Sequence, residues 1–125
     1  MDKTPSRNIE ERCFRFACRT IPVTETLMRR GGAAALLGRQ LAKAASSIGA
    51  NLEEATGAQS KADFIARTTV AFKEARESRY WVRLIQAAIP SPPSELEALR
   101  RENCELIAIL TTILKNAKSS GKGQV

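Results

Sequence analysis

The sequence predicts an all-α protein whose helices form an up-down-up-down antiparallel four-helix bundle. Apolar residues recur every three or four positions through most of the chain, which is the period of an amphipathic helix. No alternating Val/Ile/Thr run is bounded by Asn-Gly or Asp-Gly turns, so strands are not expected. The connections between the periodic segments are too short to cross a bundle. We expect residues 1–118 to form a single domain and residues 119–125 to be a flexible C-terminal tail.

The first helix is expected to begin at Asn8, a capping residue with Glu11 three positions further on. Its arginines at positions 12, 15 and 19 form a stripe that we expect to be solvated. Pro22 predicts a kink or break after Cys18, because proline lacks an amide hydrogen and crowds the carbonyl four residues earlier. The expected buried stripe is Ile9, Cys13, Ala17, Thr20, Thr24 and Met28, flanked by Phe16 and Leu27.

The second helix is expected to begin near Ala33, after two glycines that reverse the chain. Gly49 weakens this helix by about 1 kcal/mol relative to alanine. It is consistent with close approach of another helix or with a surface position. The expected buried stripe is Ala34, Leu37, Leu41, Ala44, Ala45, Ile48, Leu52 and Ala55.

The third helix carries two patterned faces. Ser60 is its predicted cap, and Asp63 completes the capping box. One face is the expected core stripe: Phe64, Ala71, Ala75, Ser78, Val82, Ile85 and Ile89. The other holds Ile65, Thr69, Phe72, Arg76, Arg79, Tyr80 and Arg83. Aligned apolar side chains rimmed by arginine indicate a subunit interface, with Ile65, Thr69, Phe72 and Tyr80 as its contacts. Alternatively, they belong to the core of a bundle with a different geometry.

The fourth helix follows the sharpest break in the chain, Pro90-Ser91-Pro92-Pro93. Ser94 is its predicted cap, and it is expected to end near Lys118. Its apolar stripe is interrupted by Asn103. The members of the stripe are Leu96, Leu99, Leu106, Ile107, Leu110, Ile113 and Leu114.

Composition limits the function classes. The chain has 20 Lys and Arg against 13 Asp and Glu, a formal net charge of +7, and no histidine. Without histidine the usual general base and the commonest metal ligand are missing, so we expect neither an enzyme nor a bound cofactor or metal. The three cysteines have no zinc spacing and indicate a reducing compartment. With no membrane span or signal peptide expected, the protein is predicted to be cytoplasmic.

Nucleic acid and acidic protein surfaces are the natural partners of such a basic chain. The residues that we expect to bind nucleic acid are Arg76, Arg79, Arg83, Arg39 and Lys43. Arginine with a nearby tyrosine is a combination that single-stranded nucleic acid uses. The alternative is that these arginines form interface or intrahelical pairs. Four carboxylates, Glu53, Glu54, Glu74 and Glu77, could meet across the second and third helices to hold a metal, but pairing with basic neighbours is the stronger interpretation.

Three segments resemble a known family when taken in order and at their spacing. They are SSIGANLEEA at 46–55, KADFI at 61–65, and KEA at 73–75 leading to Tyr80-Trp81. Over Asn8 to Lys118 the chain resembles the bacterial four-helix-bundle proteins first noticed in intervening sequences of large-subunit ribosomal RNA genes. Pro22, and Leu52 where an aromatic is frequent, depart from the family pattern.

The resemblance implies a ring-shaped homo-oligomer, typically a pentamer, without known catalytic activity. A related branch, the accessory proteins of diversity-generating retroelements, binds a reverse transcriptase and nucleic acid through basic surfaces. Nothing in the sequence places the chain in that branch. The leading hypothesis is therefore a non-enzymatic oligomeric bundle that presents basic surface to RNA or DNA, with a nucleic-acid enzyme as a further candidate partner. The rival is a protein–protein adaptor without a nucleic-acid role.

Overall fold

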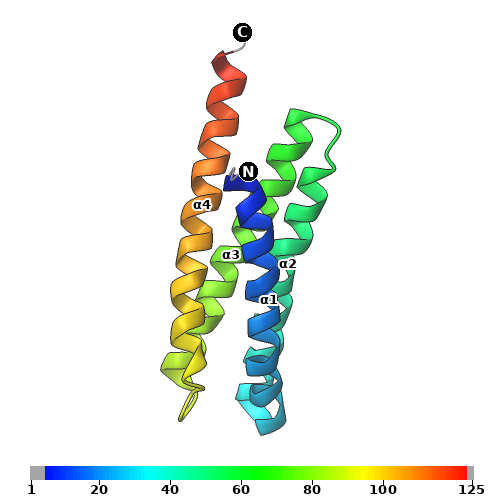
Figure 1. Cartoon of the computed structure of the whole chain (residues 1–125). Helices are drawn as coiled ribbons and strands as arrows, with labels where there is room; N and C mark the ends of the chain where they lie inside the picture. The colour runs from blue at the N-terminus through cyan, green and yellow to red at the C-terminus, as the bar shows by residue number, and fades with distance from the viewer. Residues whose placement is uncertain (1–4, 124–125) are drawn as a thin grey trace.

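Four helices make up almost all of the structure. A computed structural model describes the backbone of residues 5–123 and the side chains of residues 9–119. The helices are α1 (Pro5–Arg30), α2 (Gly32–Thr56), α3 (Lys61–Ala88) and α4 (Glu95–Gly123), and no strand occurs within residues 5–123 (Figure 1). The predicted all-α class is confirmed.

The helices share one apolar core. Each helix packs against two others: α1 against α2 and α4, and α3 against α2 and α4. Leu41, Ile48, Ile85, Leu106 and Leu110 are among the side chains with no exposed surface. Each such side chain contributes about 1.5–3 kcal/mol through burial. The core is mainly aliphatic, and it includes the ring of Phe16.

Helix α1 differs from its prediction in three ways. It begins at Pro5, so Asn8 lies inside the helix and does not cap it. It also continues through Pro22 without a break. Pro22 and Cys18 are both exposed, so the carbonyl that loses its intrahelical partner lies on the solvent side, where water can satisfy it. Finally, Phe16 and Leu27 are buried, whereas Ala17 and Met28 of the predicted buried stripe are only half-buried.

The connections follow the turn chemistry of the sequence. Gly31 and Gly32 have φ angles of +74° and +55°, which favour glycine. The Ser60 cap is confirmed, because its hydroxyl oxygen accepts a hydrogen bond from the amide of Asp63 at 3.0 Å. Helix α4 extends to Gly123, five residues beyond the predicted boundary at Lys118; the last two residues of the predicted tail, 124–125, lie outside the described residues.

Helix α1 approaches α2 more closely at Gly38 than at Gly49. A methyl group on Gly38 would lie 2.9 Å from Cβ of Leu27 and 3.3 Å from the carbonyl oxygen of Thr24. On Gly49 it would lie 3.6 Å from Cβ of Cys13, an ordinary contact. Helix α1 therefore touches both glycines, but only Gly38 has no room for a side chain.

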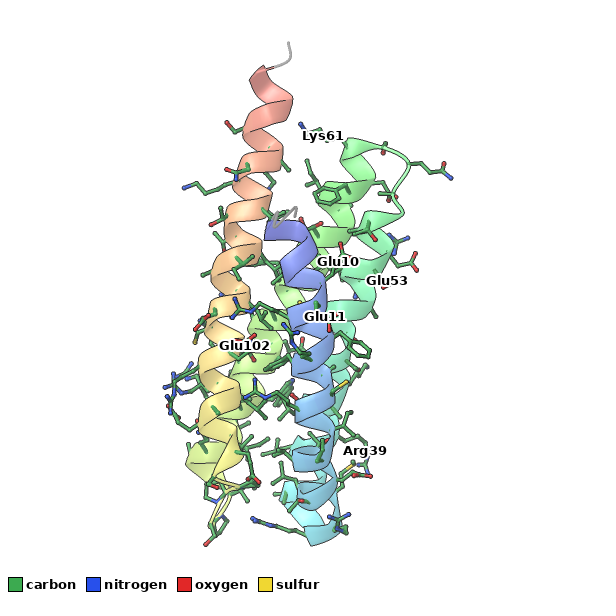
Figure 2. All side chains as sticks on the ribbon, viewed as in Figure 1. Glu10, Glu11, Arg39, Glu53, Lys61 and Glu102 are labelled. Atoms are coloured by element: carbon green, nitrogen blue, oxygen red, sulfur yellow. The ribbon has the colours of Figure 1, made fainter. Side chains whose placement is uncertain are left out.

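Two polar contacts fix α4 against its neighbours. Asn103 is fully buried; its Oδ1 accepts a hydrogen bond from Ser78 at 2.9 Å, and its Nδ2 donates to the carbonyl of Ala75 at 2.9 Å. On the other side of α4, Glu102 faces α1 and accepts hydrogen bonds from Arg12 at 2.6 and 2.9 Å (Figure 2). Arg12 is thus not the solvated side chain that its helical position predicts, because α4 covers it.

None of the described helices has an apolar segment of the length and hydropathy needed to cross a membrane.

Candidate nucleic-acid interface

Helix α3 places a row of basic side chains on its outer surface. Lys73, Arg76 and Arg83 are exposed, and Arg79 is half-buried. Their spacing of three or four residues keeps them on one side of the helix, because an α-helix turns once every 3.6 residues. Three of the five predicted nucleic-acid contacts, Arg76, Arg79 and Arg83, therefore lie together on α3.

This row borders two adjoining surface depressions. The first, of about 370 Å³, is lined by Lys73, Arg76, Glu77, Arg79, Tyr80 and Arg83. The second, of about 590 Å³, is lined by Tyr80, Arg83, Leu84, Gln86 and Ala87 of α3 and by Arg100 of α4. Tyr80 and Arg83 line both. We call the two depressions together the α3–α4 basic surface.

Arg100 and Lys73 complete this surface, and the sequence alone did not single them out. Arg100 lies on α4, so its place beside Arg83 depends on how α4 packs on α3. Spacing along α3 could have found Lys73, which lies three residues before Arg76. Together with the three predicted arginines they give five cationic side chains on one surface.

A carboxylate on α4 holds part of this surface in place. Glu97 accepts hydrogen bonds from Arg100 Nε at 3.1 Å and from Gln86 Nε2 at 3.2 Å. The hydrogen bond from Arg100, and then the one from Gln86, lower the pKa of Glu97 to about 2. Glu97 therefore stays ionised and links the two depression-lining residues across α3 and α4.

Two aromatic contacts order the row on α3. Tyr80 and Trp81 lie edge to face, with ring centroids 5.2 Å apart and an interplanar angle of 74°. The indole N–H of Trp81 donates to Glu77 at 3.4 Å. One turn earlier, the guanidinium of Arg76 lies 5.8 Å from the centroid of the Phe72 ring, a cation–π distance.

Arg39 and Lys43 belong to a different part of the molecule. Both are exposed on α2, and neither lines the two depressions of the α3–α4 basic surface. Figure 2 shows Arg39 toward the end of α2 that joins α1. Lys43 lies near Glu74. Burial and the charge of Glu77 raise the pKa of Glu74, and the charge of Lys43 offsets part of that rise. Their binding of nucleic acid stays a prediction.

The predicted interface residues lie along α3 with the arginines. Ile65, Thr69 and Phe72 are half-buried, whereas Tyr80 is 52% exposed. Phe72 packs against the core of its own chain, as the alternative interpretation expects for this residue. The face thus has an apolar first half and a basic second half. Contact of these residues with a second chain stays a prediction.

The four carboxylates considered as a metal site are not gathered in one place. Glu53 and Glu54 line a separate hollow between α1 and α2, together with Glu10, whereas Glu74 and Glu77 lie on α3 (Figure 2). The described residues contain no group of three or more acidic or cysteine side chains arranged to hold a metal ion. Of the cysteines, Cys13 is buried, which raises the pKa of its thiol to about 12.

Comparison with known proteins connects this fold to a family. The family model of the 23S rRNA-intervening sequence protein matches residues 7–112. The chain belongs to this family. The resemblance seen in the three sequence segments is thereby confirmed, and the region bearing the α3–α4 basic surface falls within the match.

A solved structure agrees with this membership. It is a crystal structure of a protein of unknown function from the S23 ribosomal protein family of Bacteroides thetaiotaomicron. It is 28% identical to this chain, with a TM-score of 0.81, and the alignment covers 90% of this chain and 99% of that one. No curated protein matches the chain. The 23S rRNA-intervening sequence protein family is of unknown function, so the comparisons supply a fold and a family without an activity.

Proposed function

We propose that this member of the 23S rRNA-intervening sequence protein family is a non-enzymatic homo-oligomeric helical bundle that binds RNA or DNA through its α3–α4 basic surface. The observation that carries the proposal is the gathering of five cationic side chains around Tyr80 on two adjoining depressions. Arginine forks onto phosphate oxygens, and four of the five cations are arginine. Among the residues that line the two depressions Glu77 is the acidic one, and Glu97 pairs with Arg100, so cations outnumber carboxylates on this surface.

The proposed assembly is an up-down-up-down antiparallel bundle that forms a ring, with a pentamer as the size that the resemblance implies. The contacts of Gly38 with Leu27 and of Gly49 with Cys13 support antiparallel packing of α1 and α2, because positions later in one helix meet positions earlier in the other. The apolar first half of the α3 face, Ile65 to Phe72, is the proposed subunit contact. Tyr80, which the sequence also predicts as an interface contact, is assigned instead to the nucleic-acid surface, because it is 52% exposed and lines both depressions. A ring would repeat each weak basic surface and so raise the overall affinity by avidity.

The second candidate is a protein–protein adaptor without a nucleic-acid role. Two contacts favour it: Arg76 lies over the Phe72 ring, and Arg100 is paired with Glu97 at 2.5 Å. Arginines engaged within the chain in this way have fewer donors left for phosphates. A nucleic-acid enzyme remains among the proposed protein partners for either function.

Binding measured over a salt series separates the two candidates. Phosphate contacts make affinity fall by about two or more decades as salt rises from roughly 50 to 200 mM. We expect this fall for the protein with a labelled oligonucleotide. Absence of binding even at about 50 mM salt would favour the adaptor. Light scattering on the same sample tests the oligomer, and a monomer would remove the avidity argument.

A further inference from the structure

We propose that Tyr80 is a stacking platform for an unpaired nucleobase, and that the α3–α4 basic surface therefore selects single-stranded over double-stranded nucleic acid. The inference deepens the proposed function and rests on it, since it presupposes that this surface binds nucleic acid. Three features carry it: the exposure of the Tyr80 ring and its contact with Trp81, the larger depression that Tyr80 lines, and the cations of the smaller depression.

The Tyr80 ring is exposed and packs against a neighbouring ring. Its exposed fraction is 52%, so part of the ring is available to a ligand. It makes an edge-to-face contact with Trp81, at 5.2 Å and 74°, and the Trp81 indole N–H donates to Glu77 at 3.4 Å. These contacts favour the orientation that the ring has in the structure, which lowers the cost of ordering it when a base stacks. Stacking on an aromatic side chain is worth about 1–3 kcal/mol per base and tolerates every base, because each has a π face.

The larger depression beside Tyr80 has the lining that a base requires. Leu84 and Ala87 supply apolar surface, and Arg83 supplies N–H donors, whereas Arg100 also lines the depression but is paired with Glu97. The amide nitrogen of Gln86 donates to Glu97, which leaves the carbonyl oxygen as the group that Gln86 can offer to a base amino group. At about 590 Å³ the depression has ample room for one base with its sugar.

The smaller depression places cations where a backbone would continue. Lys73, Arg76, Arg79 and Arg83 line it along α3, over about 15 Å at 1.5 Å per residue. A strand could thus lay phosphates along the helix while one base turns toward the ring. Single-strand binding proteins combine a cationic track with an aromatic platform in this way.

A duplex cannot use the platform without disruption. Its bases are stacked on one another and their hydrogen-bonding edges are occupied, so presenting one to Tyr80 requires extrusion, which costs a few kcal/mol. A duplex would still contact the cations through its phosphates. The surface is therefore expected to bind both forms, with the single strand favoured by the stacking contribution.

Fluorescence polarisation with the full chain tests the inference. The probes are a labelled oligothymidine of about 12 nucleotides, the same strand annealed to its complement, and a strand of the same length whose nucleotides lack their bases. We expect the oligothymidine to bind at least about tenfold more tightly than the other two at equal salt. Tyr80→Leu should weaken the oligothymidine about five-fold or more and leave the duplex unchanged, whereas Tyr80→Trp should retain binding.

Controls make the outcome specific. Phe14 on α1 is 64% exposed and lies outside the α3–α4 basic surface, so Phe14→Leu should change nothing. Circular dichroism should show both leucine variants folded, since both side chains are exposed. Tyr80→Leu should also keep the salt dependence of the wild type, because the phosphate contacts remain.

The possible failures are distinguishable. Equal affinity for the single strand, the duplex and the abasic strand, together with no change in affinity in Tyr80→Leu, would overturn the stacking platform. The proposed function would then still stand. Failure of all three probes to bind at low salt would overturn both. A loss of affinity in Phe14→Leu as large as that in Tyr80→Leu would also reject the inference.

Discussion

Removal of the buried Asn103 side chain should loosen the packing of α4 on α3. Asn103 has no exposed surface and makes two hydrogen bonds of 2.9 Å, one to the Ser78 hydroxyl and one to the Ala75 carbonyl. Each such bond contributes about 0.5–1.5 kcal/mol, and a buried hydroxyl left without a partner costs about 1–3 kcal/mol. Asn103→Ala is therefore expected to lower the free energy of unfolding by about 2–4 kcal/mol. At about 4 °C per kcal/mol for a chain of this size, Tm should fall by about 8–16 °C.

The measurement is urea and thermal unfolding followed by circular dichroism, with a double-mutant cycle as the control. Ser78→Ala and Asn103→Leu are the single variants of the cycle. Ser78→Ala removes one bond and is expected to cost about 1–2 kcal/mol. The double variant Ser78→Ala with Asn103→Leu removes both polar groups and fills the space. It should cost clearly less than Asn103→Ala alone, because no buried polar group is left unpaired. A loss below about 0.5 kcal/mol for Asn103→Ala, or costs that simply add in the double variant, would refute the reasoning.

Three further predictions concern stability and reactivity. Gly49→Ala should raise the free energy of unfolding by up to about 1 kcal/mol, because alanine has the higher helix propensity. Gly38→Ala should lower the free energy of unfolding, because the methyl group added at Gly38 collides with α1. Urea unfolding in which both variants changed stability in the same direction would contradict this. Iodoacetamide at about pH 8 should alkylate the exposed Cys18 and leave Cys13 intact until the protein unfolds, because Cys13 is buried and burial raises its pKa to about 12. Equal alkylation rates of the two cysteines, measured by mass spectrometry, would contradict this. Glu97 has a folded-state pKa lowered to about 2, so its contribution to stability is present above the ordinary pKa of 4.5 and is lost as pH falls toward 2. The difference in Tm between the wild type and Glu97→Gln should accordingly shrink over that interval, and a difference independent of pH would disprove the assignment.

The elements of the fold could be predicted from the sequence because their signals are local. Apolar periodicity, the Ser60 capping box and the two glycines at 31 and 32 each depend on a few neighbouring residues. Local rules failed where the outcome depends on what lies beside the helix. Pro22 is tolerated because its freed carbonyl lies on the solvent side. Arg12 is half-buried because it forms ion pairs with Glu102 and Glu105 of α4.

The candidate site was predictable to the extent that it lies on one helix. Arg76, Arg79, Arg83 and Tyr80 share a face by periodicity alone, and the structure puts them together. The sequence could not predict that Arg100 joins this site, because its position depends on the packing of α4 against α3, which Asn103 stabilises. Arg39 and Lys43 are the converse case. Their side chains are basic and exposed, but the sequence does not say which neighbouring surface they join, and their binding of nucleic acid stays a prediction.

The most direct test of the central claim is the salt slope of nucleic-acid binding for two matched variants. One is Arg76→Gln with Arg79→Gln and Arg83→Gln on α3; the other is the same change at the exposed arginines 15, 19 and 29 of α1. Both lose three positive charges, so only position differs. The α3 variant should reduce the slope of log K against log salt by about 2–3, at roughly 0.7–0.9 per lost phosphate contact, and the α1 variant should leave it unchanged. Equal reductions in both would show that net charge, and not the α3–α4 basic surface, accounts for binding.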